Sequence, residues 1–579
     1  MSNLLDNINN PNDIKSLKLN ELELIAEEAR KIIINTCSID GGHLAPNLGV
    51  VELTIALHYV FNSPIDKFVF DVSHQCYTHK ILTGRKDFKI NPKITGYTNK
   101  IESEHDFFNV GHTSTSVSLA TGLAKARDMQ GRKENVIAII GDGSLSGGEA
   151  YEGLNNGALL NSNFIVILND NEMSIAENYG GVYSNLQKLR ETNGEYENNY
   201  FKAMGYDYMY LENGNNIQDL VNILNEVKDT NKPIVVHVHT HKGKGYSFAE
   251  NAKEDWHWAN PFDIETGKPK NVSAVGMKYC DIVTNTIEKM IEKKEKVMVI
   301  NPACRTSIIG LAEYKTKYPE MYTDVGIAEE HSIAYLSGLA TGGVRPFGIY
   351  LSSFIQRAYD QVLQDLCLND VPATIIVERA EISGADATHV GMYDIPMLSN
   401  MPNLIYMAPK NGEELEEMIK WANIVKSPVG IRIPDGSVPI LKNNTVEKIE
   451  LYKFEKLIEG KEIAIIGVGK FFKLAEEVYE GLTKLGYTPT LINPRFLSGI
   501  DEKMLEGLLE SHSKIITLED GILSGGFGEK VSGFYSNKDM KVYSFGADKE
   551  FINNVQYAEL MKKYKLNVED IIENTLNKN

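Results

Sequence analysis

The sequence predicts an α/β protein, built from mostly parallel β-sheets with helices on their faces. Short, apolar, β-branched runs at 136–140 and 164–168 are separated by a helix-length segment, which is the pattern of a β-α-β unit. Near the C-terminus, helix-length segments again separate the apolar runs EIAIIGVG, TPTLINPRF and KIITLEDG. The length of 579 residues suggests about three or four domains, each able to bury its own core.

Composition and charge narrow the function classes. The hydrophobic and charged fractions, 42% and 24%, are those of an ordinary globular protein. The formal net charge of −19 argues against nucleic acid or an anionic membrane as a partner, although a local pocket can still be positive. The five cysteines are scattered without metal-ligand spacing, which is typical of free thiols in a reducing compartment. The N-terminus has no apolar signal core and no run is long enough to span a membrane, so we expect a cytoplasmic protein.

Polar residues follow both strands of the predicted β-α-β unit. Gly141-Asp142-Gly143 comes after the first apolar run, and Asn169-Asp170-Asn171 comes after the second. Parallel strands end at one edge of a sheet, where open α/β sheets bind their ligands. The two polar segments are therefore expected to face the same ligand.

The residue types at this edge suit a diphosphate held through Mg²⁺. The carboxylate of Asp142, the amide oxygen of Asn171 and a backbone carbonyl, for which Met173 is well placed, would supply the few protein oxygens that Mg²⁺ takes. Gly143 would let the backbone approach the phosphates. A GDG segment with an asparagine at the end of the next strand is the thiamine-diphosphate signature, whereas GDG alone would be an ordinary strand-to-turn sequence. The sequence therefore predicts thiamine diphosphate and Mg²⁺.

Segments along nearly the whole chain resemble the 1-deoxy-D-xylulose-5-phosphate synthases, in the same order and with similar spacing. They are GGHLAPNLGVVELTIALHYVF, DVSHQCYTHKILTGR, ESEHDFFNVGHTSTS, IGDGSLSGGEAYEGLN, LNDNEMSIAEN, HKGKGY, NPFDIETGK, DVGIAEEHS, SSFIQRAYDQV, ERAEISGADATH, NPRF and GGFG. The resemblance implies a transketolase-like thiamine-diphosphate enzyme with three α/β domains and a homodimeric assembly. The expected parts are a cofactor- and Mg²⁺-binding domain at 1–255, a Pro-, Gly- and charge-rich linker at 256–273, a pyrimidine-binding domain at 274–440 and a C-terminal α/β domain at 452–579.

The resemblance also implies cofactor contacts. Residues of the first domain that match cofactor-binding positions are His74, Gly111, His112, Thr113, Gly143, Ser144, Asn171, Ile175 and Tyr246. Gly111 and Thr113 precede a predicted helix, whose start suits a phosphate, and Ile175 matches the apolar wedge that bends the cofactor. In the second domain, Glu329 matches the glutamate that contacts the pyrimidine N1′ atom, and Phe354 matches the ring that stacks on the pyrimidine. Without the resemblance, DVGIAEEH would be only an acidic helix start, and a lone histidine is more often structural than catalytic.

On the substrate side, the resemblance implies binding of pyruvate and glyceraldehyde 3-phosphate, which are joined with loss of CO₂. The product, 1-deoxy-D-xylulose 5-phosphate, is a precursor of isoprenoids and thiamine. The matching substrate-binding arginines are Arg357, Arg379 and Arg432, since the guanidinium fork suits carboxylate and phosphate. Residues matching positions used for substrate hydroxyls and proton transfer are His43, Asp386 and His389.

Departures from the family pattern lie on this substrate side. Leu351 replaces a tyrosine, and the segment 384–391 is shortened, which shifts His389 relative to Asp386. Asp435 stands where the pattern has an arginine, and Ile94-Thr95-Gly96-Tyr97-Thr98 replaces a glycine-rich segment.

These departures leave alternatives open. The chain is either a working synthase with an altered pocket or a paralogue with a different donor or aldehyde acceptor. A non-catalytic binding scaffold is a third reading, which the presence of Glu329, Asp142 and Asn171 disfavours. A dinucleotide-binding dehydrogenase would rest on the glycines of 462–470 alone, which is weak support. That segment is better interpreted as the first strand of a C-terminal domain used in dimer packing, in which Arg495 is expected to be structural.

Overall fold

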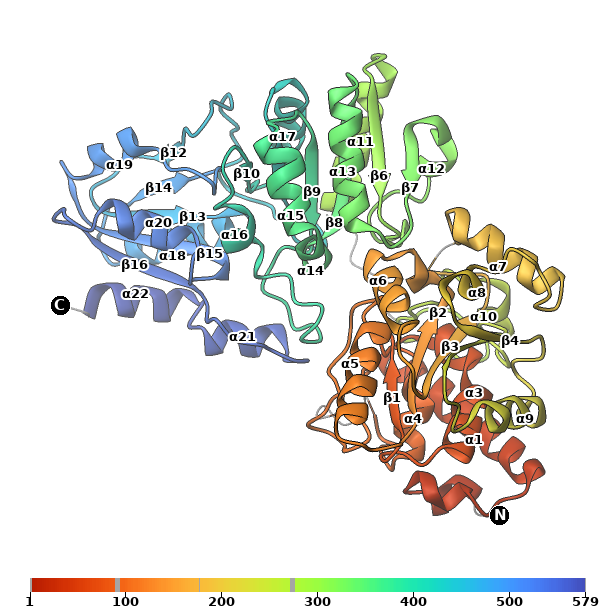
Figure 1. Cartoon of the computed structure of the whole chain (residues 1–579). Helices are drawn as coiled ribbons and strands as arrows, with labels where there is room; N and C mark the ends of the chain where they lie inside the picture. The colour runs from red at the N-terminus through yellow and green to blue at the C-terminus, as the bar shows by residue number, and fades with distance from the viewer. Residues whose placement is uncertain (1–2, 89–93, 176, 271–275, 578–579) are drawn as a thin grey trace. The chain divides into compact units, whose positions relative to one another are not determined.

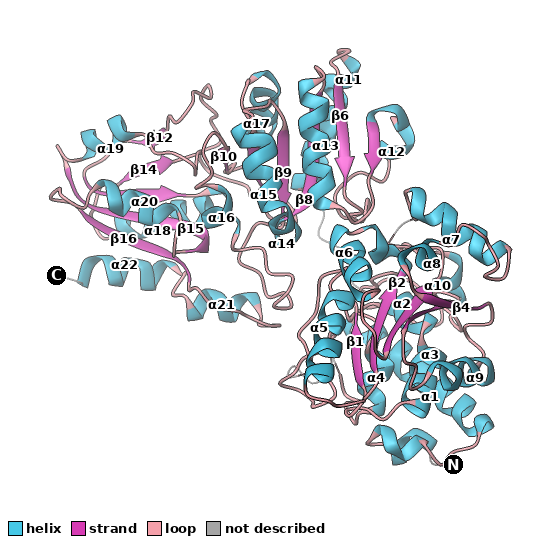
Figure 2. Cartoon of the chain, in the orientation of Figure 1, coloured by secondary structure: helices cyan, strands magenta, loops and turns pink. Residues whose placement is uncertain are grey.

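The computed structural model describes residues 3–88, 94–175, 177–270 and 276–577, which form two compact units (Figure 1). The first unit comprises Met1–Ser273 with Gly326–Ala328, and the second comprises Ala274–Val325 with Glu329–Asn579. Helices and parallel strands alternate through both units (Figure 2). Within the described residues, no helix combines the length and the apolar character needed to cross a membrane.

The first unit contains one parallel sheet with strand order β1-β2-β3-β5-β4. Its strands are β1 (Lys67–Phe70), β2 (Val136–Gly141), β3 (Phe164–Asp170), β4 (Asp207–Leu211) and β5 (Pro233–His239). Its helices are α1 (Leu19–Asp40), α2 (Leu44–Gly49), α3 (Val51–Val60), α4 (Tyr77–Leu82), α5 (Ser116–Met129), α6 (Gly148–Gly157), α7 (Gly181–Glu191), α8 (Tyr200–Met204), α9 (Ile217–Val227) and α10 (Ser247–Asn251).

Strand β2 shows why both faces of this sheet are covered. Ile137 and Ile139 belong to a core shared with α1, α3 and α9, whereas Val136, Ala138 and Ile140 belong to a core shared with α5 and α6. Successive strand residues point to opposite faces, so an uninterrupted apolar run needs a helical layer on each side. The burial of every residue of 136–140 fits the β-α-β prediction made from the sequence.

The second unit contains two sheets. The strands of the sheet ordered β10-β11-β9-β8-β6-β7, all parallel, are β6 (Val297–Asn301), β7 (Tyr322–Asp324), β8 (Arg345–Leu351), β9 (Thr374–Glu378), β10 (Ile405–Met407) and β11 (Val429–Arg432). The strands of the sheet ordered β12-β14-β13-β15-β16 are β12 (Glu455–Ile458), β13 (Glu462–Gly467), β14 (Thr490–Asn493), β15 (His512–Ile522) and β16 (Lys541–Ala547), of which only β12 pairs antiparallel. The fold class predicted from the sequence is therefore confirmed.

Helices also cover the sheets of the second unit. They are α11 (Tyr279–Glu292), α12 (Tyr314–Lys317), α13 (Glu329–Thr341), α14 (Ser352–Ile355), α15 (Tyr359–Gln361), α16 (Asp394–Leu398), α17 (Gly412–Ile424), α18 (Phe472–Lys484), α19 (Glu502–Leu508), α20 (Phe527–Phe534), α21 (Tyr557–Lys563) and α22 (Val568–Asn577). One apolar core contains residues from both sheets, such as Tyr406 and Ile466. Arg495 is buried between them in ion pairs with Glu414 and Glu455, at 2.7 and 2.8 Å, which agrees with its expected structural role.

The described part of the segment expected to be a linker, 256–270, packs against the first unit. The backbones of Gly42 and Ala259 exchange two hydrogen bonds of 2.8 Å, and a side chain on Gly41, whose φ is +70°, would meet the Ala259 carbonyl at 2.7 Å. The ring of Phe262 is buried against that of Trp256, with centroids 4.8 Å apart. The Pro-, Gly- and charge-rich composition on which the linker prediction rests gave no sign of these contacts, which the few aromatic residues of the segment make with the core.

Candidate active site

The first unit brings the two predicted polar strand ends together. Gly141 at the end of β2 is in register with Asn169 of β3, so Asp142 and Asn171 follow neighbouring strands at one edge. Both side chains are buried, and the Asn178 amide donates a 2.6 Å hydrogen bond to the Asp142 carboxylate. The amide oxygen of Asn171 is buried without a hydrogen-bond partner in the described part of the chain. Because a buried unpaired oxygen is costly, this atom fits a ligand position.

The electrostatics of Asp142 favour a cation at this edge. Burial raises the pKa of the Asp142 carboxyl well above its ordinary value, and the nearby charge of Asp170 raises that pKa further. A bound cation would offset both effects. Among the described residues, no group of three or more His, Cys, Asp and Glu side chains is placed to hold a metal. One carboxylate, one amide oxygen and a backbone carbonyl, with phosphate oxygens, would instead suit Mg²⁺.

The loop after Asn171 packs against the loop after Asp142. Met173 forms an antiparallel bridge with Glu177, and Ile175 follows it, half-buried. A Cβ atom on Gly143 would lie 2.9 Å from the Cα atom of Ser174, so only glycine fits this approach. Ser144 is buried, and its carbonyl accepts a 2.9 Å hydrogen bond from the Ser114 hydroxyl.

The predicted phosphate cradle is fixed by an aspartate at the end of β1. The Asp71 carboxylate accepts hydrogen bonds from the backbone N–H groups of Ser114 and Ser116, at 2.8 and 3.0 Å. These contacts hold the segment Gly111-His112-Thr113, which is separated from α5 by two residues, beside the ends of β1 and β2. Burial raises the pKa of Asp71, while the hydrogen bonds that it accepts act in the opposite direction.

A cluster of aromatic and imidazole rings lies in the same unit. The ring of His43 lies 5.0 Å from that of His74 and 5.6 Å from that of His257, and the rings of His74 and His257 stack at 5.4 Å. The Asn47 amide donates to the carbonyls of both His43 and His74, which fixes the two loops relative to each other. Tyr97 joins the cluster, 5.8 Å from His43. The altered segment 94–98 therefore contributes a ring here.

Two residues of this region were not found from the sequence. His257 lay in the presumed linker, where its position between Trp256 and Trp258 was the one available signal. Lys242 follows β5 and is almost fully buried, and its ammonium donates a 2.5 Å hydrogen bond to the Ser174 carbonyl. Burial lowers the pKa of Lys242 to about 8. The position of Lys242 just after an apolar run, in the segment HKGKG, was a signal that this lysine lies at the edge of the sheet where the ligand is expected.

Tyr246 has a different environment from the one expected. Its hydroxyl donates a 2.9 Å hydrogen bond to the Ile264 carbonyl, and its ring packs against those of Trp256 and Phe262, at 5.3 and 5.7 Å. These contacts anchor the segment 256–270 to the first unit. We therefore leave Tyr246 out of the cofactor site.

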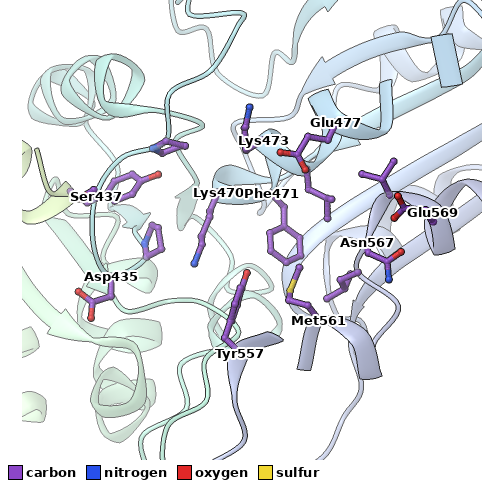
Figure 3. A pocket seen from close by; sticks show the side chains of 16 residues that line it. Asp435, Ser437, Lys470, Phe471, Lys473, Glu477, Tyr557, Met561, Asn567 and Glu569 are labelled. Carbon is purple, nitrogen blue, oxygen red and sulfur yellow. The ribbon is translucent and has the colours of Figure 1, made fainter. Parts of the chain in front are cut away.

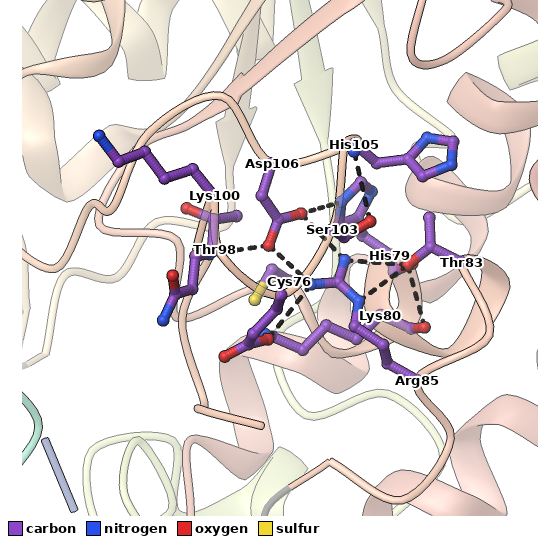
Figure 4. A network of polar contacts seen from close by, with 12 residues as sticks. Cys76, His79, Lys80, Thr83, Arg85, Thr98, Lys100, Ser103, His105 and Asp106 are labelled. Carbon is purple, nitrogen blue, oxygen red and sulfur yellow. Dashed lines mark hydrogen bonds and ion pairs between the residues drawn. The ribbon is translucent and has the colours of Figure 1, made fainter. Parts of the chain in front are cut away.

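A buried polar network lies under the loop that precedes the cradle (Figure 4). The Asp106 carboxylate accepts from Arg85 at 2.7 and 2.9 Å, from the backbone N–H of Asn99 at 2.7 Å, and pairs with His79 at 2.8 Å. The other ring nitrogen of His79 lies 2.8 Å from the ring of His58. His79 is thus a structural residue that helps to hold the loop.

This network predicts loss of stability in mild acid. Burial lowers the pKa of His79 and, more strongly, that of His58, so both stay neutral in the folded protein where the unfolded chain would be protonated. Their contribution to the free energy of unfolding is therefore fully present above the unfolded pKa of about 6.5. At lower pH it is lost, by about 1.4 kcal/mol per pH unit for each such histidine. The melting temperature should therefore decrease when the pH is lowered from 7.5 to 5.5.

The matched control for this prediction is an exposed histidine. His58→Gln should reduce the pH dependence of the melting temperature, whereas His241→Gln, at a side chain that is 55% exposed, should not. A melting temperature that is the same at both pH values in the unaltered protein would contradict the prediction.

In the second unit, Glu329 is the first residue of α13, and its carboxyl group is buried. Its Oε2 atom has no hydrogen-bond partner in the described structure and lies 3.7 Å from the nearest guanidinium nitrogen of Arg357. Burial raises the pKa of Glu329 to about 7, although Arg357 opposes this shift. Near neutral pH, such a carboxyl group can accept a hydrogen bond from a protonated ring nitrogen, or donate one to an unprotonated ring nitrogen. Arg357 thus lies beside the predicted activating glutamate.

Phe354 and the shortened segment meet at the same sheet. Phe354 lies on α14, just after β8 ends at Leu351, and its ring packs edge-on against His389 at 5.5 Å. The Thr388 hydroxyl lies 2.9 Å from the Asp386 carboxylate and 2.8 Å from Nδ1 of His389. Although the segment 384–391 is shortened, Asp386 and His389 are therefore still connected by hydrogen bonds through the side chain of Thr388.

The other two predicted arginines differ in exposure. Arg379 follows β9, and its partly exposed side chain pairs with Asp435 at 3.4 Å. Arg432 is buried, and its guanidinium donates to the Asp394 carboxylate at 2.7 Å and to the carbonyls of Ala380 and Asp520 at 2.6 and 2.8 Å. These contacts make Arg432 part of the packing between the two sheets, and we do not retain it as a substrate ligand.

Four family models match the chain. They are 1-deoxy-D-xylulose-5-phosphate synthase over residues 5–198, the thiamine diphosphate binding domain of transketolase over 110–327, the pyrimidine binding domain of transketolase over 275–440 and the C-terminal domain of transketolase over 453–571. With the geometry above, they define a transketolase-type transferase that carries a thiamine-diphosphate-binding domain.

Curated relatives narrow this class. The 1-deoxy-D-xylulose-5-phosphate synthase of Natranaerobius thermophilus is 39% identical over 100% of this chain and 99% of its own length. Those of Caldanaerobacter subterraneus subsp. tengcongensis and Clostridium tetani are each 38% identical, over 99% and 100% of both chains. The chain belongs to the 1-deoxy-D-xylulose-5-phosphate synthase family. Among solved structures, transketolase from Leishmania mexicana covers 96% of this chain and 97% of its own, at 17% identity and a TM-score of 0.45.

Proposed function

We propose that this protein joins pyruvate to D-glyceraldehyde 3-phosphate, with loss of CO₂, to give 1-deoxy-D-xylulose 5-phosphate. The observation that carries the proposal is the full-length relationship to synthases of that product, at 37–40% identity. The buried pair Asp142 and Asn171 and the buried Glu329 support it, since they provide for a metal-held diphosphate and for an activating carboxyl group.

We assign the diphosphate end of the cofactor to the first unit. Asp142, Asn171 and the Met173 carbonyl would hold Mg²⁺. The proposed phosphate and ring contacts are His74, Gly111, His112, Thr113, Gly143, Ser144 and Ile175. Thiamine diphosphate supplies, when bound, a nucleophilic carbon and a sink for the electrons released on decarboxylation. In the second unit, Glu329 would keep a proton on the pyrimidine N1′ atom, and Phe354 would stack on that ring.

We assign the substrates to charged and imidazole side chains. Arg357 and Arg379 would bind the carboxylate and the phosphate, while His43, His389 and Asp386 would orient hydroxyl groups and move protons. The rings of His43 and His74 already lie together, as do Phe354 and His389 within the second unit. We further propose domains at 1–255, 274–440 and 452–579 joined by 256–273, a homodimer, a cytoplasmic location and supply of isoprenoid and thiamine precursors.

Product identification tests this function. Purified protein with thiamine diphosphate, Mg²⁺, pyruvate and glyceraldehyde 3-phosphate should form 1-deoxy-D-xylulose 5-phosphate and CO₂, identified by mass, and product should be lost without the cofactor. If other aldehyde or ketose-phosphate pairs turn over and this product does not form, the alternative of a paralogue with another donor or acceptor replaces the proposal.

A further inference from the structure

Arg379 is held at the carboxyl edge of the second unit's first sheet in an uncommon backbone conformation. It follows β9 directly, and its φ is +54°, in the left-handed region that non-glycine residues seldom adopt. A Cβ atom on Gly391 would lie 1.9 Å from the Arg379 carbonyl, so the neighbouring chain packs closely against this peptide. The backbone of Arg379 is therefore constrained, while its side chain remains 42% exposed and accessible to a ligand.

The exposed guanidinium of Arg379 is engaged by Asp435. One carboxylate oxygen of Asp435 lies 3.4 Å from a terminal nitrogen of Arg379, and the other accepts a 2.8 Å hydrogen bond from the N–H of Gly436. The N–H of Asp435 donates in turn to the Glu381 carboxylate at 3.2 Å. The loop after β11 thus holds the Asp435 carboxylate on Arg379.

Other carboxyl groups lie close to this pair. Glu378, the last residue of β9, is buried, and one of its oxygens has no hydrogen-bond partner in the described structure. Burial raises the pKa of Glu378 to about 8; Arg379 acts against this shift, and the charges of Asp435 and Asp281 add to it. Glu378 is therefore mainly protonated near neutral pH, and the negative charge that faces the Arg379 guanidinium is that of Asp435.

Lys470 does not compensate for this charge. Asp435 lines a cavity of about 500 Å³ that also contains Lys470, Tyr557 and Glu477 (Figure 3). Lys470 is paired with the Glu381 carboxylate, and its ammonium lies 5.2 Å from the centre of the Tyr557 ring. Its positive charge is thus already balanced within the protein.

We infer that Asp435 is a specificity-determining residue that weakens binding of a phosphorylated aldehyde by pairing with Arg379, an inference that rests on the proposed role of Arg379 in acceptor binding. An incoming phosphate must either displace the carboxylate or bind beside a like charge. Because the pair is half-exposed, it is weak enough to open, so Asp435 raises the KM for the phosphate without blocking the reaction. Uncharged aldehydes would be affected much less.

Kinetics with two acceptors test the inference. Asp435→Asn keeps the acceptor for the Gly436 N–H and removes the charge. At saturating pyruvate, we expect it to lower the KM for glyceraldehyde 3-phosphate about fivefold, more at low ionic strength. The kcat and the KM for unphosphorylated D-glyceraldehyde should stay unchanged. Glu477→Gln is the matched control, since Glu477 lies on the opposite side of the cavity in Figure 3 and should change neither KM.

Binding of an unreactive phosphate separates this inference from the proposed function. Calorimetric titration of the cofactor-loaded protein with glycerol 3-phosphate needs no turnover. Asp435→Asn should bind it more tightly than the unaltered protein, and the gain should vanish in the Arg379→Ala background. An unchanged affinity, or a gain that persists without Arg379, would overturn the inference even if 1-deoxy-D-xylulose 5-phosphate is formed. If that product is absent but the gain is seen, the proposed function fails and the role of Asp435 stands.

Discussion

Glu329→Gln is expected to lower kcat by at least about a hundredfold, the size typical of losing a positioned acid–base group. The amide keeps the shape of the side chain but cannot transfer a proton to or from a ring nitrogen. The fold should survive, because the variant replaces a buried carboxyl group, whose pKa is raised to about 7, by a neutral group. Steady-state kinetics and the melting temperature together measure this prediction.

Glu330→Gln is the matched control for Glu329→Gln. Glu330 is the next residue of α13, has the same type of side chain and is only half-buried. Its variant should keep most of the activity. Equal losses in the two variants would show that the acidic start of the helix matters and that Glu329 has no particular role.

Asp142→Asn is expected to weaken the Mg²⁺-dependent binding of thiamine diphosphate strongly, while leaving the protein without cofactor at least as stable. The Asn178 amide can still donate to the new side chain, so the local packing is kept. Removing a buried charge close to Asp170 relieves repulsion in the absence of a cation. Losing the anionic ligand should weaken cofactor binding by about a hundredfold or more, because even outer-shell partners of a metal contribute about tenfold to a hundredfold.

Calorimetric titration with thiamine diphosphate, with and without Mg²⁺, and thermal melting measure the two effects. Glu152→Gln, at an exposed position of α6, is the control and should change neither. Binding by Asp142→Asn that still responds to Mg²⁺ would remove Asp142 from the metal site.

The strand ends of the first unit were predictable because their signals are local. Apolar β-branched runs that stop at Gly141 and at Asp170 define β2 and β3, and the parallel pairing of β2 and β3 then brings Asp142 and Asn171 to one edge. The same local pattern marked β13, although β12 precedes it in the chain, so β13 is the second strand of the last sheet and not the first as expected. In each case, neighbouring residues in the sequence specify both the strand and its end.

The remaining parts of the site depend on contacts between distant segments. His257 lies beside His43 because the segment around it is anchored at the end of α1 by backbone hydrogen bonds from Ala259 and Phe262. The polar composition of the segment gave no sign of this packing. The burial of Arg432 follows from two sheets packing together around Asp394. The sequence showed that Asp435 changes the charge near a presumed phosphate site, but only the structure pairs it with Arg379.

Exchange of the thiazolium C2 proton tests most directly the claim that this protein binds and activates thiamine diphosphate. In D₂O, with Mg²⁺ and cofactor bound, NMR of the unaltered protein should show exchange at least about a hundredfold faster than in the free cofactor. The Glu329→Gln protein should bind the cofactor without that acceleration. A cofactor-loaded, folded, unaltered protein that exchanges this proton no faster than free thiamine diphosphate would contradict the claim and support a non-catalytic binding protein.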